Sequence, residues 1–132
     1  MIPIDKLAWI EIRDYNILST RSEGKDTYYI PGGKREPGET NHQALVREIL
    51  EELSVHLIPE TLKLYGIFQA QAHGYAAGIN VKMQCYTGRY TGTLAASTEI
   101  AELVWLTYSD REKISPVDKL IFDQLKREGL LR

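Results

Sequence analysis

One segment between residues 40 and 54 constrains the fold of this chain more than any other. Apolar side chains recur there at helical spacing, at Leu45, Val46, Ile49, Leu50 and Leu53. Thr40 precedes them as an N-cap, and Gln43 follows three residues later, as in a capping box. The segment therefore predicts a helix that begins after Thr40, ends near Ser54 and buries one face against a core.

The rest of the chain carries mostly strand and turn signals. Stretches rich in β-branched and aromatic residues predict strands over residues 7–13, 17–20, 27–30, 62–70, 79–90 and 102–106. A second helix is expected to begin at Pro116, because proline suits the first helical position. Its apolar face is expected to contain Leu120, Ile121, Leu125 and Leu130. This order predicts one domain over residues 1–132, built as a mixed α/β or α+β sandwich.

The first predicted helix also has an acidic face. Glu48, Glu51 and Glu52 stand at positions i, i+3 and i+4, which places them in a narrow arc opposite the apolar stripe. An acidic helix face is usually only solvated, but like charges at this spacing repel one another. Carboxylate oxygens suit Mg²⁺ or Mn²⁺, so a divalent cation is the natural way to offset the repulsion.

A glycine-rich loop leads into this helix. Gly32 and Gly33 follow a proline and allow close approach of the backbone, so that a carbonyl group there could bind a metal. Glu39 stands just before the helix, where its carboxylate can bind the same metal or pair with Arg47. Taken alone, the loop would be an ordinary turn. The loop and the acidic face together predict a metal site.

These residues resemble the Nudix box. The family pattern is a glycine, five residues, a glutamate, seven residues, and then Arg-Glu-aliphatic-any-Glu-Glu-any-Gly-aliphatic. The sequence has Gly33, Glu39 and a matching run from Arg47 to Val55, with Ser54 in place of the second glycine. That glycine is a left-handed helix cap, so the departure concerns the local turn more than the chemistry.

The resemblance, which covers residues 33–55 and is closest to small MutT-like Nudix domains, implies both a fold and an activity. It implies an α+β fold, an α/β/α sandwich with a mixed β-sheet between helices. It also implies an enzyme that uses Mg²⁺ (or Mn²⁺) to hydrolyse nucleoside diphosphate-linked compounds. The implied metal ligands are the box acids, one carbonyl group and a later acid: Glu48, Glu51, Glu52, Gly32 and Glu99. The implied catalytic residues are Glu48, which is the favoured general base, with Glu52, Arg47 and Glu39.

Three further residues are implied in substrate binding. Arg21 resembles a phosphate-contacting arginine, although a solvent-facing strand residue is an equal alternative. Tyr28 and Tyr29 point to opposite faces of a strand, so one is expected in the core and the other at the site, where Tyr29 is the candidate to stack on a base. Asp118 lies where relatives recognise a base edge, and its carboxylate could accept hydrogen bonds from an exocyclic amine. It could also be only an acid favoured at a helix N-terminus. Glu99, in the same way, could be a surface loop residue.

Composition limits the partners and the compartment. Sixteen basic and eighteen acidic side chains give a formal net charge of −2, without the basic surface that a nucleic-acid polymer or a membrane would require. Cys85 is the single cysteine, which excludes an internal disulfide and favours the reducing cytoplasm. The expected partner is therefore a small-molecule nucleotide, and the resemblance also allows a homodimer.

The short chain favours one substrate class among those of the family. It looks most like MutT-type enzymes, which convert (d)NTPs to the monophosphate and pyrophosphate. An ADP-ribose or nucleotide-sugar pyrophosphatase is the alternative enzyme. A non-catalytic nucleotide-binding module is disfavoured, because such modules typically lose box glutamates and this chain keeps Glu39, Glu48, Glu51 and Glu52.

Overall fold

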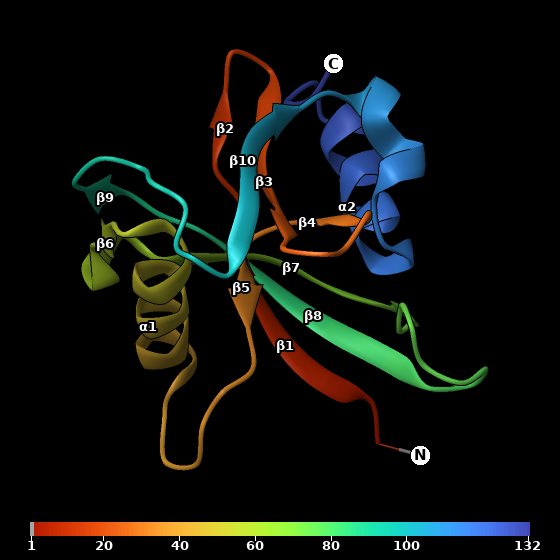
Figure 1. The fold of residues 1–132 in the computed structure, drawn as a ribbon, viewed down its shortest axis with the longest axis horizontal. Coiled ribbons are helices and arrows are strands. Elements are labelled where there is room, and N and C mark those ends of the chain that lie inside the picture. Colours follow the sequence, from red (N-terminus) through yellow and green to blue (C-terminus); the bar gives the residue numbers. More distant parts are fainter. Residues whose placement is uncertain (1) are drawn as a thin grey trace.

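The computed structural model describes residues 2–132 as two four-stranded sheets flanked by two helices (Figure 1). The first sheet has the order β5-β1-β8-β7, made of Gly32–Gly33, Ile4–Trp9, Asn80–Thr87 and Lys63–Gln71. Strand β1 runs parallel to β8, whereas β1–β5 and β7–β8 are antiparallel. The expected mixed sheet is therefore confirmed.

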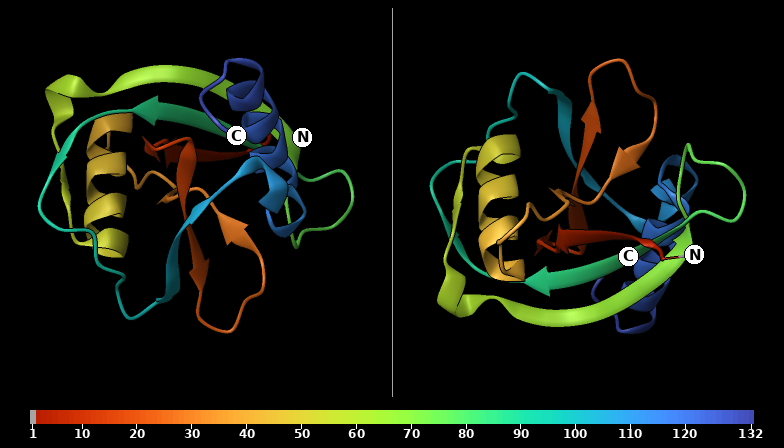
Figure 2. Two further views of the ribbon diagram at one scale, coloured as in Figure 1. Left: turned by 90° about the horizontal axis from the view of Figure 1, so that it is seen from above. Right: turned by 90° about the horizontal axis from the view of Figure 1, so that it is seen from below.

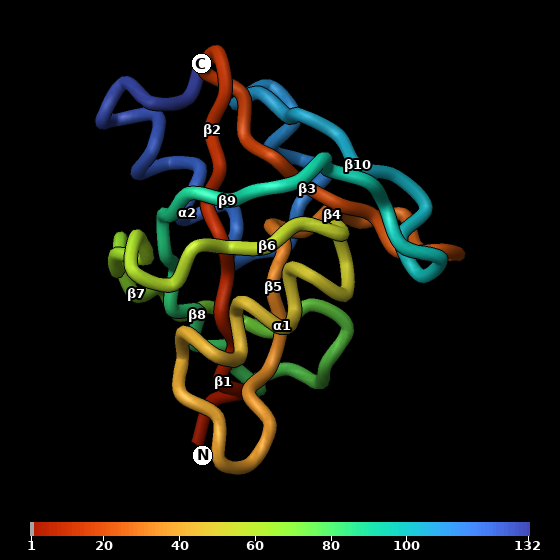
Figure 3. Tube along the Cα trace, turned by 90° about the vertical axis from the view of Figure 1, so that its left-hand side faces the viewer, coloured from red at the N-terminus to blue at the C-terminus, as the bar shows by residue number. Residues whose placement is uncertain are grey.

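The second sheet packs beside the first. It has the order β10-β3-β2, made of Ile100–Leu106, Asn16–Ser22 and Ile12–Arg13, and β4 (Tyr28–Tyr29) also pairs with β3. A two-stranded ribbon of β6 (His56–Leu57) and β9 (Tyr90–Thr91) lies beyond the end of the first helix, as Figure 3 shows. The structure also contains two 3₁₀ turns, at Pro59–Thr61 and Tyr108–Lys113, and two α-helices.

The strand predicted over residues 7–13 is wrong, because the chain changes sheets in its middle. The backbone N–H of Ile10 donates to the carbonyl of Tyr86 at 2.8 Å, in the first sheet. The next carbonyl, of Glu11, accepts from the N–H of Leu18 at 2.9 Å, in the second sheet. The two residues between β1 and β2 therefore connect the sheets.

Helix α1 (Asn41–Leu53) begins as the sequence predicts. The Thr40 hydroxyl accepts from the Gln43 N–H at 3.1 Å, and the Gln43 side chain accepts from the Thr40 N–H at 3.0 Å. Ser54 ends the helix in the left-handed region, with φ 65°. The apolar stripe is buried at most of its positions, but Leu50 is exposed.

Helix α2 (Pro116–Arg127) also begins at the predicted proline. Its buried face consists of Val117, Asp118, Ile121, Phe122 and Leu125. Leu120 was expected on this face but is exposed, because it falls outside the arc that these five positions define. Leu130 is exposed as well, since it follows the end of the helix.

The two helices lie on opposite sides of the molecule, each over its own core (Figure 2). Strand β1 and the residue that follows it contribute side chains to both cores. Leu7 and Trp9 pack in the cluster under α1, whereas Ala8 and Ile10 pack in the cluster under α2. Because successive side chains of a strand point to opposite faces, β1 is buried from both sides. Within residues 2–132, no helix is long and apolar enough to cross a membrane.

Candidate active site

Arg47 joins the acidic residues of α1 and its leading loop. Its Nε and Nη2 atoms donate to the two carboxylate oxygens of Glu39, at 2.7 and 2.8 Å. Its Nη1 atom donates to Glu48 at 2.8 Å and lies 3.5 Å from Glu51. The paired bond with Glu39 is the strong geometry that a planar guanidinium provides. It lowers the pKa of Glu39 to about 2, with help from the Glu36 N–H.

Glu48 packs directly against the glycine loop. A Cβ atom on Gly33 would lie 2.4 Å from the Glu48 carboxyl carbon, so only glycine leaves room for this side chain. Burial raises the pKa of Glu48, and the neighbouring Arg47 opposes that rise. The carboxylate is therefore held in place from two sides.

Glu52 is the most desolvated acid of the cluster. Its Oε1 atom accepts a hydrogen bond from the Gly32 N–H at 3.1 Å. Burial raises its pKa to about 8 despite this bond, and the charges of Glu48, Glu51 and Glu99 raise it further. The cluster thus combines several acids with a single arginine. Of these acids, Glu52 is the one whose charged form burial disfavours most.

The donor chemistry of the cluster fits a hard divalent cation. Carboxylate oxygens from Glu48, Glu51 and Glu52 lie on one helix face beside the Gly32 backbone, and such oxygens are the ligands that Mg²⁺ and Mn²⁺ prefer. Within residues 2–132, no three acids or histidines converge on one point, because Glu48 is turned toward Arg47 and Glu52 toward Gly32. These side chains would have to leave their present partners to hold a cation together.

A groove leads away from Glu52 between the two sheets. One cavity of about 220 Å³ is lined by Gly32, Gly33 and Glu52 at one end and by Thr20, Ser22, Tyr29 and Lys6 further along. Tyr29 also lines a cavity of about 40 Å³ with Ser115 and one of about 400 Å³ with Ser22. The three cavities therefore meet at Tyr29, and the predicted base-stacking residue lies beside the acidic cluster.

Asp118 is fully buried and lines none of these three cavities, although its neighbour Val117 lines the smallest of them. Its Oδ2 atom accepts from the Ile30 N–H at 3.0 Å, whereas its Oδ1 atom has no partner. Ser115, the residue before α2, lines the small cavity beside Tyr29, and its hydroxyl is buried. Burial raises the pKa of Asp118 to about 7. The Ser115 side chain lies beside Asp118 and helps to lower its pKa, so Ser115 is the member of this pair that reaches a cavity.

The structure places Arg21 away from the groove. Its Nε and Nη2 atoms donate to Glu102 at 3.2 and 2.8 Å, and its Nη1 atom donates to the Lys25 carbonyl at 2.8 Å. Thr20 and Ser22, its neighbours on β3, line the groove, so Arg21 points to the other face of the strand. The expected phosphate contact is not supported by this placement.

Glu99 lies in an exposed turn just before β10. It does not touch the cluster, although its charge is close enough to raise the pKa of Glu52. The loop before it crosses the end of α1, where the Ser97 N–H donates to the Glu52 carbonyl at 2.9 Å. Glu99 is therefore a neighbour of the cluster.

The structure adds two residues that sequence reasoning did not assign to the site. Lys6 lines both the cavity beside Glu52 and the one beside Ser115. His73 lies 6.1 Å from Tyr29, ring centre to ring centre, and its Nε2 atom is 3.1 Å from the Thr27 hydroxyl. The only feature of the sequence that pointed to His73 as a site residue was its position in a loop. Nothing in the sequence pointed to Lys6, because a lysine in a strand is not by itself a sign of a binding site.

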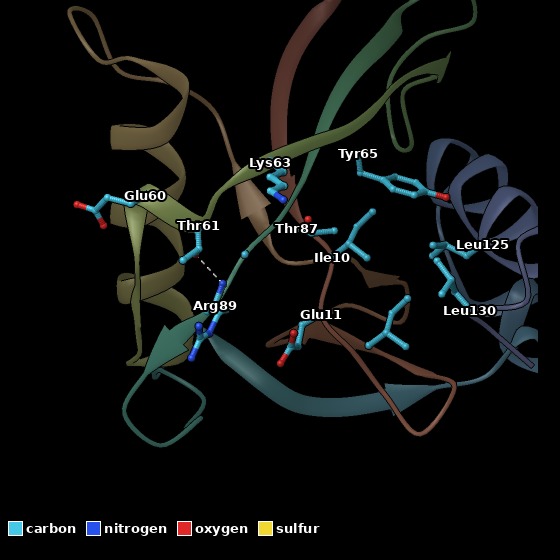
Figure 4. A pocket seen from close by; sticks show the side chains of 12 residues that line it. Ile10, Glu11, Glu60, Thr61, Lys63, Tyr65, Thr87, Arg89, Leu125 and Leu130 are labelled. Atoms are coloured by element: carbon cyan, nitrogen blue, oxygen red, sulfur yellow. Dashed lines mark hydrogen bonds between the residues drawn. The ribbon is translucent and has the colours of Figure 1, made fainter.

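A larger cavity, of about 670 Å³, lies elsewhere (Figure 4). Residues such as Glu11, Thr61, Lys63 and Arg89 line it, and none of the predicted site residues does. The groove at Glu52 is therefore the candidate active site on chemical grounds, although it is the smaller hollow.

Comparison with known proteins agrees with this geometry. The NUDIX domain family matches residues 7–125, which is most of the chain. The chain belongs to the Nudix family. The MutT NUDIX hydrolase of Burkholderia pseudomallei shares the fold, with a TM-score of 0.77 and 20% identity over 95% of this chain and 99% of that one. The solution structure of the E. coli ORF135 protein has a TM-score of 0.73 and 28% identity, over 96% of this chain and 92% of that one.

Two Nudix relatives match in sequence. The uncharacterized Nudix hydrolase YvcI of Bacillus subtilis is 26% identical over 121 residues, which are 89% of this chain and 77% of that protein. The human 8-oxo-dGDP phosphatase NUDT18 is 46% identical over 46 residues, which are 35% of this chain and only 14% of that protein. Membership of this hydrolase family identifies the chain as an enzyme.

Proposed function

We propose that this Nudix enzyme hydrolyses nucleoside triphosphates to the monophosphate and pyrophosphate, with Mg²⁺ or Mn²⁺ at the acidic face of α1. One observation carries the proposal. The groove that begins at Glu52 continues past Tyr29 to a small cavity lined by His73 and by the buried side chain of Ser115. An acidic cluster at one end suits metal and phosphates, and an aromatic ring with polar atoms at the other end suits a base.

Glu48, Glu51 and Glu52 would hold the cation, together with the Gly32 carbonyl and with Glu99 nearby. A divalent cation supplies the positive charge that neutralises phosphate oxygens in phosphoryl chemistry.

The chain's own residues fix the reacting groups. Arg47 holds Glu39 and Glu48 through direct hydrogen bonds, so it orients the acids on the helix face. Glu48 is the favoured general base, since burial raises its pKa toward the range in which a carboxylate can accept a proton effectively. Lys6 lies in the same groove and places a positive charge near the path of the phosphates.

The other end of the groove would bind the base. Tyr29 offers a partly buried ring for stacking, and the Ser115 hydroxyl in the cavity beside it offers a polar group for a base edge, with Asp118 buried next to Ser115. The human relative acts on 8-oxo-dGDP by its name, which supports a nucleoside phosphate as the substrate. All these residues come from one copy of the chain. Cytoplasmic nucleotides are the proposed substrate pool.

A turnover screen with Mg²⁺ tests the proposal, with products identified by mass. The panel would contain standard and oxidised (d)NTPs, ADP-ribose, a dinucleoside polyphosphate and coenzyme A. Pyrophosphate and a monophosphate from a triphosphate are the expected products. Cleavage of ADP-ribose alone would replace the proposal with the nucleotide-sugar alternative. Binding without any cleavage would point to a non-catalytic module.

Glu52→Gln is the variant that links this activity to the acidic cluster. It removes a proposed cation ligand, so turnover should fall by about 100-fold or more. The amide oxygen can still accept from the Gly32 N–H, and the charge that burial disfavours is gone, so the melting temperature should hold or rise. Glu60→Gln, at an exposed position in a 3₁₀ turn, is the matched control and should leave turnover unchanged. Normal turnover by the Glu52→Gln variant would show that Glu52 is not part of the active site.

A further inference from the structure

Strand β7 is an unpaired edge of the first sheet. It is nine residues long and pairs only with β8, at the end of the order β5-β1-β8-β7. Both views of Figure 2 show it as the outermost strand, with α2 over one face of the sheet and no other strand beyond it. A long edge strand presents backbone groups that can pair with another chain.

The hydrogen bonds beside β7 show which backbone groups face outward. The Ala72 N–H donates to the Ile79 carbonyl at 2.7 Å, and these residues continue the β7–β8 register by one pair. Because hydrogen-bonded and non-hydrogen-bonded pairs alternate in an antiparallel ladder, Ala70 and Phe68 bond to β8. Ile67, Gln69 and Gln71 therefore direct their N–H and C=O groups away from the sheet.

A hydrogen bond between β8 and the β1 side of the sheet independently supports this assignment of inward and outward residues. The Tyr86 carbonyl accepts from the Ile10 N–H, so Tyr86 faces the β1 side of β8. Its neighbour Cys85 then faces β7, where it is paired with Gly66. Gly66 is thus an inward residue like Phe68 and Ala70, and the assignment of the outward residues is consistent along the strand.

The edge has few of the features that prevent pairing. Lys63 is the only charged residue of β7, and the strand contains no proline. The Ile67 side chain is 51% exposed, and the Gln69 side chain is also exposed. Natural edge strands are usually blocked by charges, prolines or short length. This strand is blocked only at its first residue.

We propose that β7 pairs with β7 of a second copy of this chain, antiparallel about a two-fold axis at Gln69. Ile67 then lies opposite Gln71 of the second copy, and Gln69 lies opposite its own counterpart. This register joins all the outward N–H and C=O groups of the three residues, whereas a shift along the strand leaves some of them unpaired. It brings no two charged side chains together.

The second copy is favoured over another protein because the edge is its own complement. The same three residues supply every donor and every acceptor, and the two-fold symmetry is the commonest for homo-oligomers. Strand pairing alone makes a small interface, so the association should be weak, with a Kd of about 10–100 μM.

Sedimentation velocity over concentrations on both sides of that range tests the proposal. The sedimentation coefficient of the full chain should rise with concentration from that of a monomer to that of a dimer. A monomer at every concentration would overturn the proposal.

Charge variants at the two-fold axis test the register. Gln69→Lys places like charges directly opposite each other, and Gln69→Glu does the same, so each variant alone should remain monomeric. An equal mixture of the two should associate again, because opposite charges then face each other. Neither variant should change the melting temperature, since the Gln69 backbone does not bond to β8 and its side chain is exposed.

Leu120→Lys is the matched control. Leu120 is 41% exposed on α2, away from the β7 edge, so this variant should associate like the parent chain. Association of Gln69→Lys as strong as that of the parent, or no recovery in the mixture, would overturn pairing at Gln69.

Discussion

Asp118 is a carboxyl group with no exposed surface, at the first turn of α2. Burial raises its pKa to about 7, against the lowering effects of the Ile30 N–H, the Ser115 side chain and the charge of Lys6. The folded chain therefore holds this proton more tightly than the unfolded chain does. Below about pH 4 both states are protonated, and Asp118 has no effect on stability. Between about pH 4 and pH 7 only the unfolded state loses the proton, so the folded state is progressively destabilised.

Asp118→Asn should remove this pH dependence. The amide cannot ionise, and its oxygen can still accept from the Ile30 N–H. The free energy of unfolding of the variant, relative to the parent, should therefore improve between pH 4 and pH 8, by about 4 kcal/mol. Urea titrations of both proteins at several pH values measure this difference directly, and other acids cancel in the comparison. A difference that does not vary with pH would show that Asp118 is not neutral in the folded chain at pH 5–6.

At the scale of elements, the end of α1 is shaped by one residue in a left-handed conformation. Ser54 has φ 65°, and its N–H donates to the Leu50 carbonyl at 3.1 Å. Glycine adopts this conformation without the strain that a Cβ atom causes. Ser54→Gly should therefore raise the free energy of unfolding by about 0.5–1 kcal/mol. Chemical denaturation measures it, with Ser54→Ala as a control that should bring no gain. A clear loss in the glycine variant would mean that the serine side chain stabilises the cap.

The two glycines of β5 make a paired prediction, because their missing side chains face different groups. A Cβ atom on Gly32 would lie 1.9 Å from the Leu7 carbonyl oxygen, which is backbone and cannot move without breaking the β1–β5 pairing. Gly32→Ala should therefore destabilise the fold by about 2 kcal/mol or more. A Cβ atom on Gly33 meets only the flexible Glu48 carboxyl group.

Gly33→Ala should displace Glu48 and lower turnover by at least about 10-fold with a small change in melting temperature. Thermal denaturation and steady-state kinetics of the two variants separate these effects. The reverse outcome, with a destabilised Gly33→Ala and a stable Gly32→Ala, would contradict the arrangement of the loop.

The elements that the sequence predicted well are those whose signals are local. The capping box at Thr40 and the proline at Pro116 act within one helical turn, so both helix starts were correct. The split between β1 and β2 depends on hydrogen bonds to Tyr86 and to Leu18 in different sheets, which no local pattern reveals. The short strand β5 was missed for the same reason, since it exists only through pairing with β1.

At the scale of the whole molecule, the groove also combines residues that are close in sequence with residues that only folding brings together. The acidic cluster could be predicted, because Glu39, Arg47 and the helix acids are close in sequence. Lys6 could not be predicted, and His73 had only its loop position as a signal, because β1 and the β7–β8 hairpin reach the groove only in the folded chain. Arg21 was expected at the site, but the register of β3 against β10 pairs it with Glu102 instead.

His73 links the two sheets across the mouth of the groove. It stands in the β7–β8 hairpin loop of the first sheet, and its Nε2 atom is 3.1 Å from the hydroxyl of Thr27, in the loop before β4 of the second sheet. The Gln71 side chain holds the hairpin loop in shape, with hydrogen bonds to the Ala76 carbonyl and from the Gly78 N–H, both at 2.9 Å. The shape of the loop is therefore supported by the chain's own hydrogen bonds.

His73→Ala should weaken substrate binding while leaving the acidic cluster intact. Loss of one hydrogen bond between the loops, and of the ring edge beside Tyr29, should raise KM by about 5-fold, because a net hydrogen bond contributes about 1 kcal/mol. The value of kcat should change little, since His73 is not among the residues around Arg47. Steady-state kinetics on the triphosphate found in the screen measures both, and His56→Ala, exposed in β6, is the control. A fall in kcat without a change in KM would show that the hairpin loop acts on the reacting groups, and the base end of the groove would then have to be sought elsewhere.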